Sequence, residues 1–171
     1  MSFRARLETD NHKVFPLLLP DGTTGGKGLL AFIIPLELLC RGEVEPKVRN
    51  WFETLKHDQP LCELVQPLLR SWYDGHWNYQ FDEYDRYLQN YIHAPMTEAA
   101  FSEIRTLNNR WSNTQALCTS TKELLLLLTS EDRTETWWYH PQATLLELPI
   151  LINTIEHAEK GSATAVRICF M

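Results

Sequence analysis

The sequence predicts an α+β fold in which a single domain, residues 1–171, packs several helices against an antiparallel sheet. Apolar and charged residues alternate with period two near the N-terminus, as in a half-buried strand, whereas apolar residues at helical spacing dominate the middle of the chain. The composition, 44% hydrophobic and 22% charged residues, is typical of a globular protein with a substantial core. No internal repeat, linker or low-complexity tract divides the chain, so one domain is expected.

The N-terminal part predicts a meander of three strands. Alternation over residues 3–8 indicates the first strand, and an apolar run at 14–19 indicates the second. That run stops at a Pro-Asp-Gly sequence at 20–22, which is a strong turn signal. A further apolar run at 29–34, after a glycine-rich loop, is expected to form the third strand.

Helices are expected to follow, because apolar residues now recur at helical spacing. Pro67 should break or kink one of them, and Thr97 is a suitable N-cap for another. The expected helical segments are 46–55, 61–69, 81–91 and 97–111.

The C-terminal part returns to mixed structure. Residues 124–128 read as a buried strand with a hairpin partner at 134–139, and 163–170 read as the last strand. Between them, Thr144 and Glu147 have the spacing of a capping box at the start of a helix. Gly161 is expected as the C′ residue that ends this helix.

The four cysteines, Cys40, Cys62, Cys118 and Cys169, lie more than 20 residues apart and form no metal-binding pair. An even number allows two disulfides, but the N-terminal residues lack an apolar signal core. We therefore expect buried, free thiols and a cytoplasmic protein. The longest apolar runs are shorter than a membrane span, so a soluble protein without membrane contact is expected.

Motifs that would indicate catalysis or a bound cofactor are missing from the sequence. The glycine-rich loop at 21–28 is one residue short of a P-loop, and the expected strand after it would offer no helix N-terminus to a phosphate. The six histidines have no ligand spacing, and no nucleophile motif is present. The sequence therefore predicts no cofactor, no metal and no enzymatic activity, although a pocket assembled from distant residues stays open.

The charge favours a cationic partner. The formal net charge is −6, with 8 basic and 8 acidic residues in 1–60 but 8 basic and 14 acidic residues in 61–171. A negative surface repels nucleic-acid phosphates and attracts basic proteins. Nucleic-acid binding is therefore not expected.

The segment 72–91 combines 8 aromatic with 4 acidic residues among its 20 positions. Tyrosine and tryptophan supply rigid contact area, and carboxylates steer and pair with a basic partner. The alternative is that the aromatic rings fill the core beneath a solvated acidic rim. The candidate partner-binding residues are Asp74, Trp77, Tyr79, Asp82, Glu83, Tyr84, Asp85 and Tyr87.

In size, acidity and lack of catalytic motifs, the chain resembles the immunity proteins of bacterial toxin systems. The resemblance implies a cytoplasmic inhibitor that binds a cognate, cationic toxin domain and blocks its active site. Two alternatives remain: a small-molecule-binding enzyme of another type, and a regulatory or structural subunit of a larger assembly. The sequence leaves the oligomeric state open.

If segment 72–91 contacts a cationic partner, Asp82→Lys or Asp85→Lys should slow association, because rim charges act mainly on the on-rate. Stopped-flow or surface-plasmon association rates at low and high salt would measure the effect. Unchanged rates in both variants would place the interface elsewhere.

Overall fold

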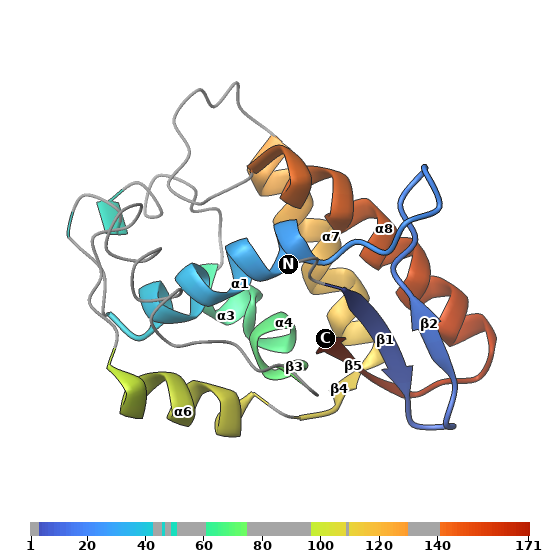
Figure 1. The fold of residues 1–171 in the computed structure, drawn as a ribbon, viewed down its shortest axis with the longest axis horizontal. Helices are drawn as coiled ribbons and strands as arrows, with labels where there is room; N and C mark the ends of the chain where they lie inside the picture. The colour runs from blue at the N-terminus through green and yellow to red at the C-terminus, as the bar shows by residue number, and fades with distance from the viewer. Residues whose placement is uncertain are drawn as a thin grey trace.

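The computed structural model confirms the α+β class (Figure 1). It describes residues 4–42, 46, 49–50, 61–74, 97–108, 110–129 and 141–171, with the backbone alone at 73, 74, 101 and 105. The elements, in chain order, are β1 (Ala5–Thr9), β2 (Val14–Pro16), α1 (Lys27–Cys40), α3 (Leu61–Leu64), α4 (Gln66–Arg70), β3 (Trp72–Asp74), α6 (Glu98–Leu107), β4 (Ser112–Asn113), α7 (Thr114–Thr129), α8 (Pro141–Lys160) and β5 (Ala165–Phe170).

The C-terminal strand β5 lies at the centre of the sheet. On one side it pairs with β1, which pairs in turn with β2, and both pairings are antiparallel as predicted. On its other side β5 pairs with β4 in antiparallel and with β3 in parallel orientation. At the end of β5, Ile168, Cys169 and Phe170 are all buried, so both faces of the strand are covered there, which explains the weak alternation of its sequence.

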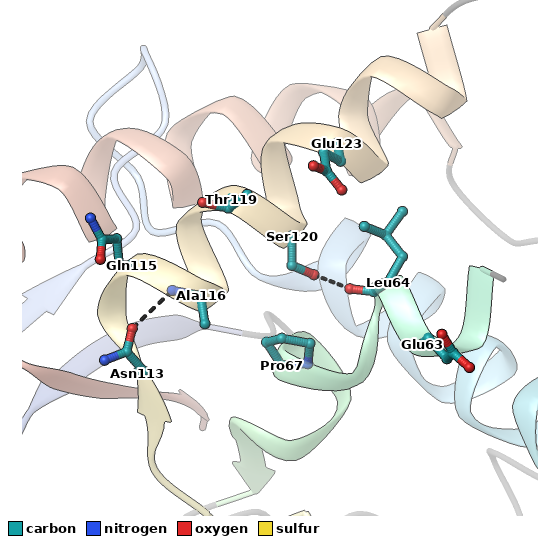
Figure 2. A pocket seen from close by; sticks show the side chains of 9 residues that line it. All are labelled: Glu63, Leu64, Pro67, Asn113, Gln115, Ala116, Thr119, Ser120 and Glu123. Carbon is teal, nitrogen blue, oxygen red and sulfur yellow. Dashed lines mark hydrogen bonds between the residues drawn. The ribbon is translucent and has the colours of Figure 1, made fainter. Parts of the chain in front are cut away.

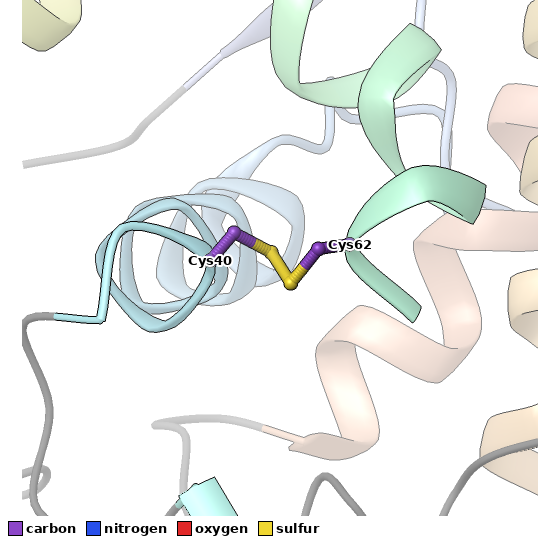
Figure 3. Close-up of a disulfide and its surroundings, with 2 residues drawn as sticks. All are labelled: Cys40 and Cys62. Atoms are coloured by element: carbon purple, nitrogen blue, oxygen red, sulfur yellow. A yellow bond between two sulfur atoms is a disulfide. The ribbon is translucent and has the colours of Figure 1, made fainter. Parts of the chain in front are cut away.

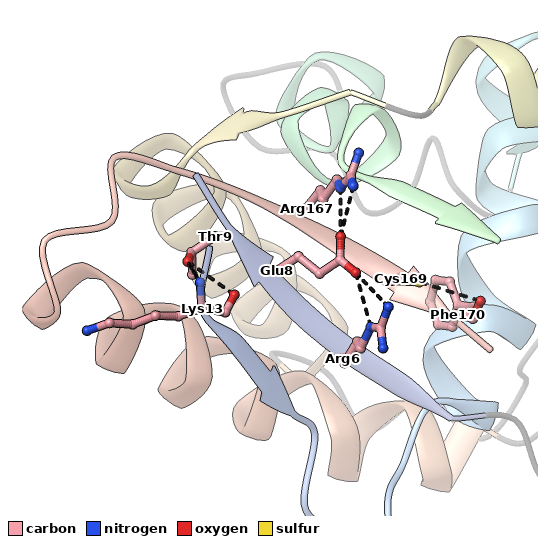
Figure 4. Close-up of polar contacts among 7 residues, drawn as sticks. All are labelled: Arg6, Glu8, Thr9, Lys13, Arg167, Cys169 and Phe170. Atoms are coloured by element: carbon pink, nitrogen blue, oxygen red, sulfur yellow. Dashed lines mark hydrogen bonds and ion pairs between the residues drawn. The ribbon is translucent and has the colours of Figure 1, made fainter. Parts of the chain in front are cut away.

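Side chains on β1 separate cleanly into two faces. Ala5 and Leu7 are fully buried, whereas Arg6 and Glu8 point to the other face. The Glu8 carboxylate forms an ion pair with Arg6 at 2.8 Å and a second with Arg167 on β5 at 2.9 Å (Figure 4). Since Glu8 and Arg167 are direct cross-strand partners, this contact favours the observed register of β1 against β5.

The helix α8 packs along both α1 and α7. Its approach to α1 is closest at Gly28, where an added Cβ would lie 2.4 Å from the backbone of Ala143 and Thr144. Only glycine therefore permits this crossing. The hydroxyl of Thr144 donates to the Gly28 carbonyl at 2.6 Å, so the contact is also held by a hydrogen bond.

Glu147, on α8, caps α1. Its carboxylate accepts hydrogen bonds from the Gly26 amide at 3.0 Å and from the Leu29 amide at 2.8 Å, and the residue is only 3% exposed. A negative group at this end also complements the helix dipole. The predicted capping box of Thr144 and Glu147 is wrong: α8 begins earlier, at Pro141, and both side chains instead bind residues near the start of α1.

Two predicted strands are helical. Residues 29–34 lie within α1, and 124–128 lie within the second half of α7. Both are short continuous apolar runs, whose periodicity does not distinguish a buried strand from a buried helix. The run in α1 is buried on nearly all sides. Its residues are therefore apolar on every face, and the sequence shows no alternation of polar and apolar residues at helical spacing. The predicted hairpin partner at 134–139 lies outside the described residues.

Helix boundaries follow local chemistry. The Thr97 hydroxyl accepts from the Ala100 amide at 3.1 Å, which confirms this residue as the N-cap of α6. The predicted break near Pro67 is also confirmed, since α3 ends and α4 begins just before it. At the end of α8, however, Ser162 rather than Gly161 takes the left-handed conformation, with φ of 70°. The Ala163 amide then closes the turn on the Ala158 carbonyl.

The expectation of four free thiols is wrong. A disulfide joins Cys40, the last residue of α1, to Cys62 on α3, with Cα atoms 5.4 Å apart (Figure 3). Spacing in the sequence could not reveal this pair, because it is the fold that brings the two helices together. Cys118 and Cys169 are free and buried, as expected.

Glu147→Ala should lower the free energy of unfolding by about 2–4 kcal/mol, because the Gly26 and Leu29 amides would lose their acceptors in a buried site. Glu147→Gln keeps one acceptor oxygen and should lose about half as much. Urea denaturation measures both. Glu159→Ala, at an exposed position of the same helix, is the control. An equal cost in the two alanine variants would contradict the capping role.

Replacing Cys40 and Cys62 together by serine should lower the free energy of unfolding by about 3 kcal/mol, because the bond closes a loop with a sequence separation of 22. The measurement is urea denaturation with and without reductant. Reductant should destabilise the wild type and leave the double variant unchanged. A wild type insensitive to reductant would contradict the prediction.

Candidate functional site

A groove of about 470 Å³ lies between α7 and the pair α3–α4 (Figure 2). It falls in the size range of ligand and side-chain binding pockets. Figure 2 shows Leu64 and Pro67 between the two helical layers, with Glu123 on α7 above them. The lining residues are Glu63, Leu64, Pro67, Asn113, Gln115, Ala116, Thr119, Ser120 and Glu123.

One row of α7 side chains forms the long wall of the groove. Gln115, Thr119 and Glu123 are all exposed and follow one another at a spacing of four residues, which places them on one helical face. The start of α7 is fixed by Asn113, whose side-chain oxygen accepts from the Ala116 amide at 3.0 Å.

The opposite wall is tied to α7 and to the preceding strand β4 by side-chain hydrogen bonds. The Ser120 hydroxyl donates to the Leu64 carbonyl at the end of α3, and the Ser112 hydroxyl donates to the Pro67 carbonyl at 3.0 Å. Both helices are short, so the Leu64 carbonyl at the end of α3 and the Pro67 carbonyl in the last turn of α4 are among the helix-end acceptors that a helix does not satisfy itself. These two bonds therefore hold the walls of the groove together.

The groove is electronegative. Glu63 and Glu123 are both exposed, and the described lining residues include no lysine, arginine or histidine. The adjacent cation on α7, Lys122, pairs instead with Glu156 of α8 at 2.5 Å. This hydrogen bond raises the pKa of Lys122 and lowers the pKa of Glu156, so both groups stay charged and compensate each other. Lys122 is therefore engaged by Glu156 and not by the groove carboxylates.

The predicted partner-binding residues cannot be compared with this groove. Asp74 ends β3, where its backbone pairs with Phe170, but its side chain is outside the described part. The other seven lie in 75–96, also outside it. The neighbouring Trp72 is described: it is 1% exposed and packs edge-on against Phe170 at 6.2 Å. At this position the aromatic ring fills the core.

Sequence reasoning missed the groove. The polar row of α7 would have been visible had 124–128 been assigned to the same helix as Gln115, Thr119 and Glu123. The contribution of α3 could not have been found, because Glu63 lies 60 residues from Glu123 in the sequence.

The glycine-rich loop also differs from its expectation. The residues after it form α1, so a helix N-terminus does follow the loop. The Glu147 carboxylate occupies that N-terminus, and its negative charge excludes a phosphate there. The expectation of a strand after the loop is therefore wrong.

Comparison with known proteins gives no relative. No protein-family model matches the chain, and neither a curated protein nor a solved structure is significantly similar to it. Among the described residues, no group of three or more histidine, cysteine, aspartate or glutamate side chains is placed to hold a metal ion. None of the described helices combines the length and apolarity that a membrane span requires.

Proposed function

We propose that the chain is a protein-binding domain whose groove between α7 and α3–α4 receives a basic side chain from a cationic partner. The observation that carries this proposal is the pair of exposed carboxylates, Glu63 and Glu123, in a groove whose described lining has no basic residue. The net charge of −6 acts in the same direction over longer distances.

An arginine of the partner suits the groove best. Its guanidinium carries five donors that match carboxylate oxygens, and its aliphatic stem would lie on Leu64 and Pro67. The amide of Gln115 and the hydroxyl of Thr119 offer further acceptors along the wall. Charge-assisted hydrogen bonds of this kind are stronger than neutral ones, and arginine is enriched at interface hot spots.

Within this class, the proposed role is that of an immunity protein that neutralises a cognate cationic toxin domain. It is supported by the acidity of the chain and by the electronegative groove. The candidate residues of segment 74–87 stay a separate proposal for partner contact, because their side chains lie outside the described residues. The cytoplasmic location expected from the sequence conflicts with the Cys40–Cys62 disulfide, since such bonds persist mainly in oxidising compartments. We therefore propose that the partner is met in an oxidising compartment.

Glu123→Gln should weaken binding of the partner about tenfold, because one carboxylate facing the basic side chain is lost. The complex is obtained by co-expression with the product of the neighbouring gene and pull-down at low salt. Isothermal titration calorimetry on the purified pair then gives the affinity.

Glu159→Gln is the matched control, because it removes the same charge from an exposed position on α8, outside the groove lining. It should change the affinity less than about twofold. No complex with the neighbouring gene product, or equal losses in the two variants, would overturn the proposal.

A further inference from the structure

The disulfide between Cys40 and Cys62 lies directly beside one wall of the groove. Cys62 is the second residue of α3, and the next two residues, Glu63 and Leu64, both line the groove. Its partner Cys40 ends α1, a helix that contributes no residue to the described lining (Figure 3). The bond therefore joins a carboxylate-bearing wall of the groove to a support outside it.

The helix α1 is a firm support for this bond. Its first turn is held by the buried carboxylate of Glu147, and most of its residues from Gly28 to Leu39 are buried. Beyond Cys40, the Arg41 amide donates to the Glu37 carbonyl at 3.1 Å and closes the last turn. The position of Cys40 is thus set by contacts that do not involve the disulfide.

The helix α3, by contrast, depends on its attachments. It has 4 residues, Leu61–Leu64, and a single turn is not stable by itself, because helix nucleation is costly. Among the described contacts, the Ser120 hydroxyl attaches the Leu64 carbonyl to α7, and the disulfide attaches Cys62 to α1. Opening the bond therefore removes the covalent attachment of this wall.

The disulfide is also more accessible than the free thiols. Neither Cys40 nor Cys62 is fully buried, whereas Cys118 and Cys169 are. A thiolate must reach a sulfur atom to open a disulfide, and exposed disulfides exchange more readily than buried ones. Burial raises the pKa of the Cys118 thiol, which makes it a poor nucleophile toward the bond. An external thiol can therefore act on this pair selectively.

We propose that the Cys40–Cys62 disulfide is a redox switch of the groove. In the oxidised protein the bond fixes α3, with Glu63, in the arrangement that forms the groove. A dithiol breaks the S–S bond: two electrons and two protons pass to Cys40 and Cys62, which become thiols, and the dithiol becomes a disulfide. In the reduced protein α3 is released and the groove loses one wall. The effect on binding rests on the proposed function, whereas the release of α3 does not.

Backbone ¹⁵N relaxation tests the release of α3 without a partner. The order parameters of the Glu63 and Leu64 amides should fall from about 0.85 in the oxidised protein to below about 0.6 after reduction with dithiothreitol, while Ile155 on α8 stays rigid. These values report the folded state, so a lower global stability does not change them. Alkylation and mass spectrometry identify the cysteines that were reduced. A bond that dithiothreitol leaves closed in the folded protein, or unchanged order parameters in α3, would overturn the proposal.

Two variants separate the switch from a general effect of the reductant. Cys40→Ser combined with Cys62→Ser should show the low order parameters of α3 without dithiothreitol. Cys169→Ala removes a buried thiol from β5 and keeps the disulfide, so α3 should remain rigid in it. Equal mobility of α3 in these two proteins would contradict the switch.

Isothermal titration calorimetry with the purified product of the neighbouring gene tests the effect on binding. The affinity of the double serine variant should be about tenfold lower than that of the oxidised wild type, as expected if the released wall adopts the binding arrangement about a tenth of the time. Cys169→Ala should bind within about twofold of the wild type. Equal affinities of the wild type and the double variant would overturn the switch. If the oxidised wild type itself does not bind, the proposed function fails, and the order parameters still decide whether the disulfide controls α3.

Discussion

The first amides of α1 are satisfied by a side chain far along the chain: Glu147 accepts from Gly26 and Leu29, which precede it by 121 and 118 residues. Because the carboxylate is buried, both bonds form only if α8 has one particular position along α1 and one rotation about its own axis. Gly28 then permits the helices to touch, and Thr144 closes the contact on its carbonyl. The position of α7 follows, since it packs on α8, and with it the long wall of the groove.

Local sequence chemistry predicted the fold class and several boundaries. The alternation of apolar and charged residues located β1. Thr97 located the start of α6, and Pro67 located the break between α3 and α4. Segments of two helices were read as strands, because an unbroken run of apolar residues hides the period of the helix: the run in α1 is buried on nearly all sides, and the run in α7 includes the exposed Leu126. The Glu147 cap and the disulfide could not be predicted, since both depend on residues that only the fold brings together.

Two cavities of the protein differ in the charged residues that line them. The groove beside α7 has two carboxylates and no basic residue in its described lining, whereas a smaller cavity of about 180 Å³, where the ends of α1, α4 and α6 meet, is lined by residues that include two arginines, a glutamate and an asparagine with an unsatisfied amide. The net charge of −6 therefore does not describe the residues around each cavity. The acidic composition agrees in sign with the groove, but the residues proposed from the sequence for partner contact are not among its described lining residues. Composition gave no indication of the second cavity, which depends on the ends of three helices.

The helix α1 is fastened at both of its ends. Glu147 holds its first turn, and the disulfide at Cys40 holds its last residue to α3. Helices ordinarily open from their termini, where a few amides exchange with solvent without disturbing the rest of the protein. With both termini held, fraying contributes little to the opening of α1. Its amide hydrogens would then exchange mainly through cooperative unfolding of the core. The exchange rates of these amides would therefore report the global free energy of unfolding.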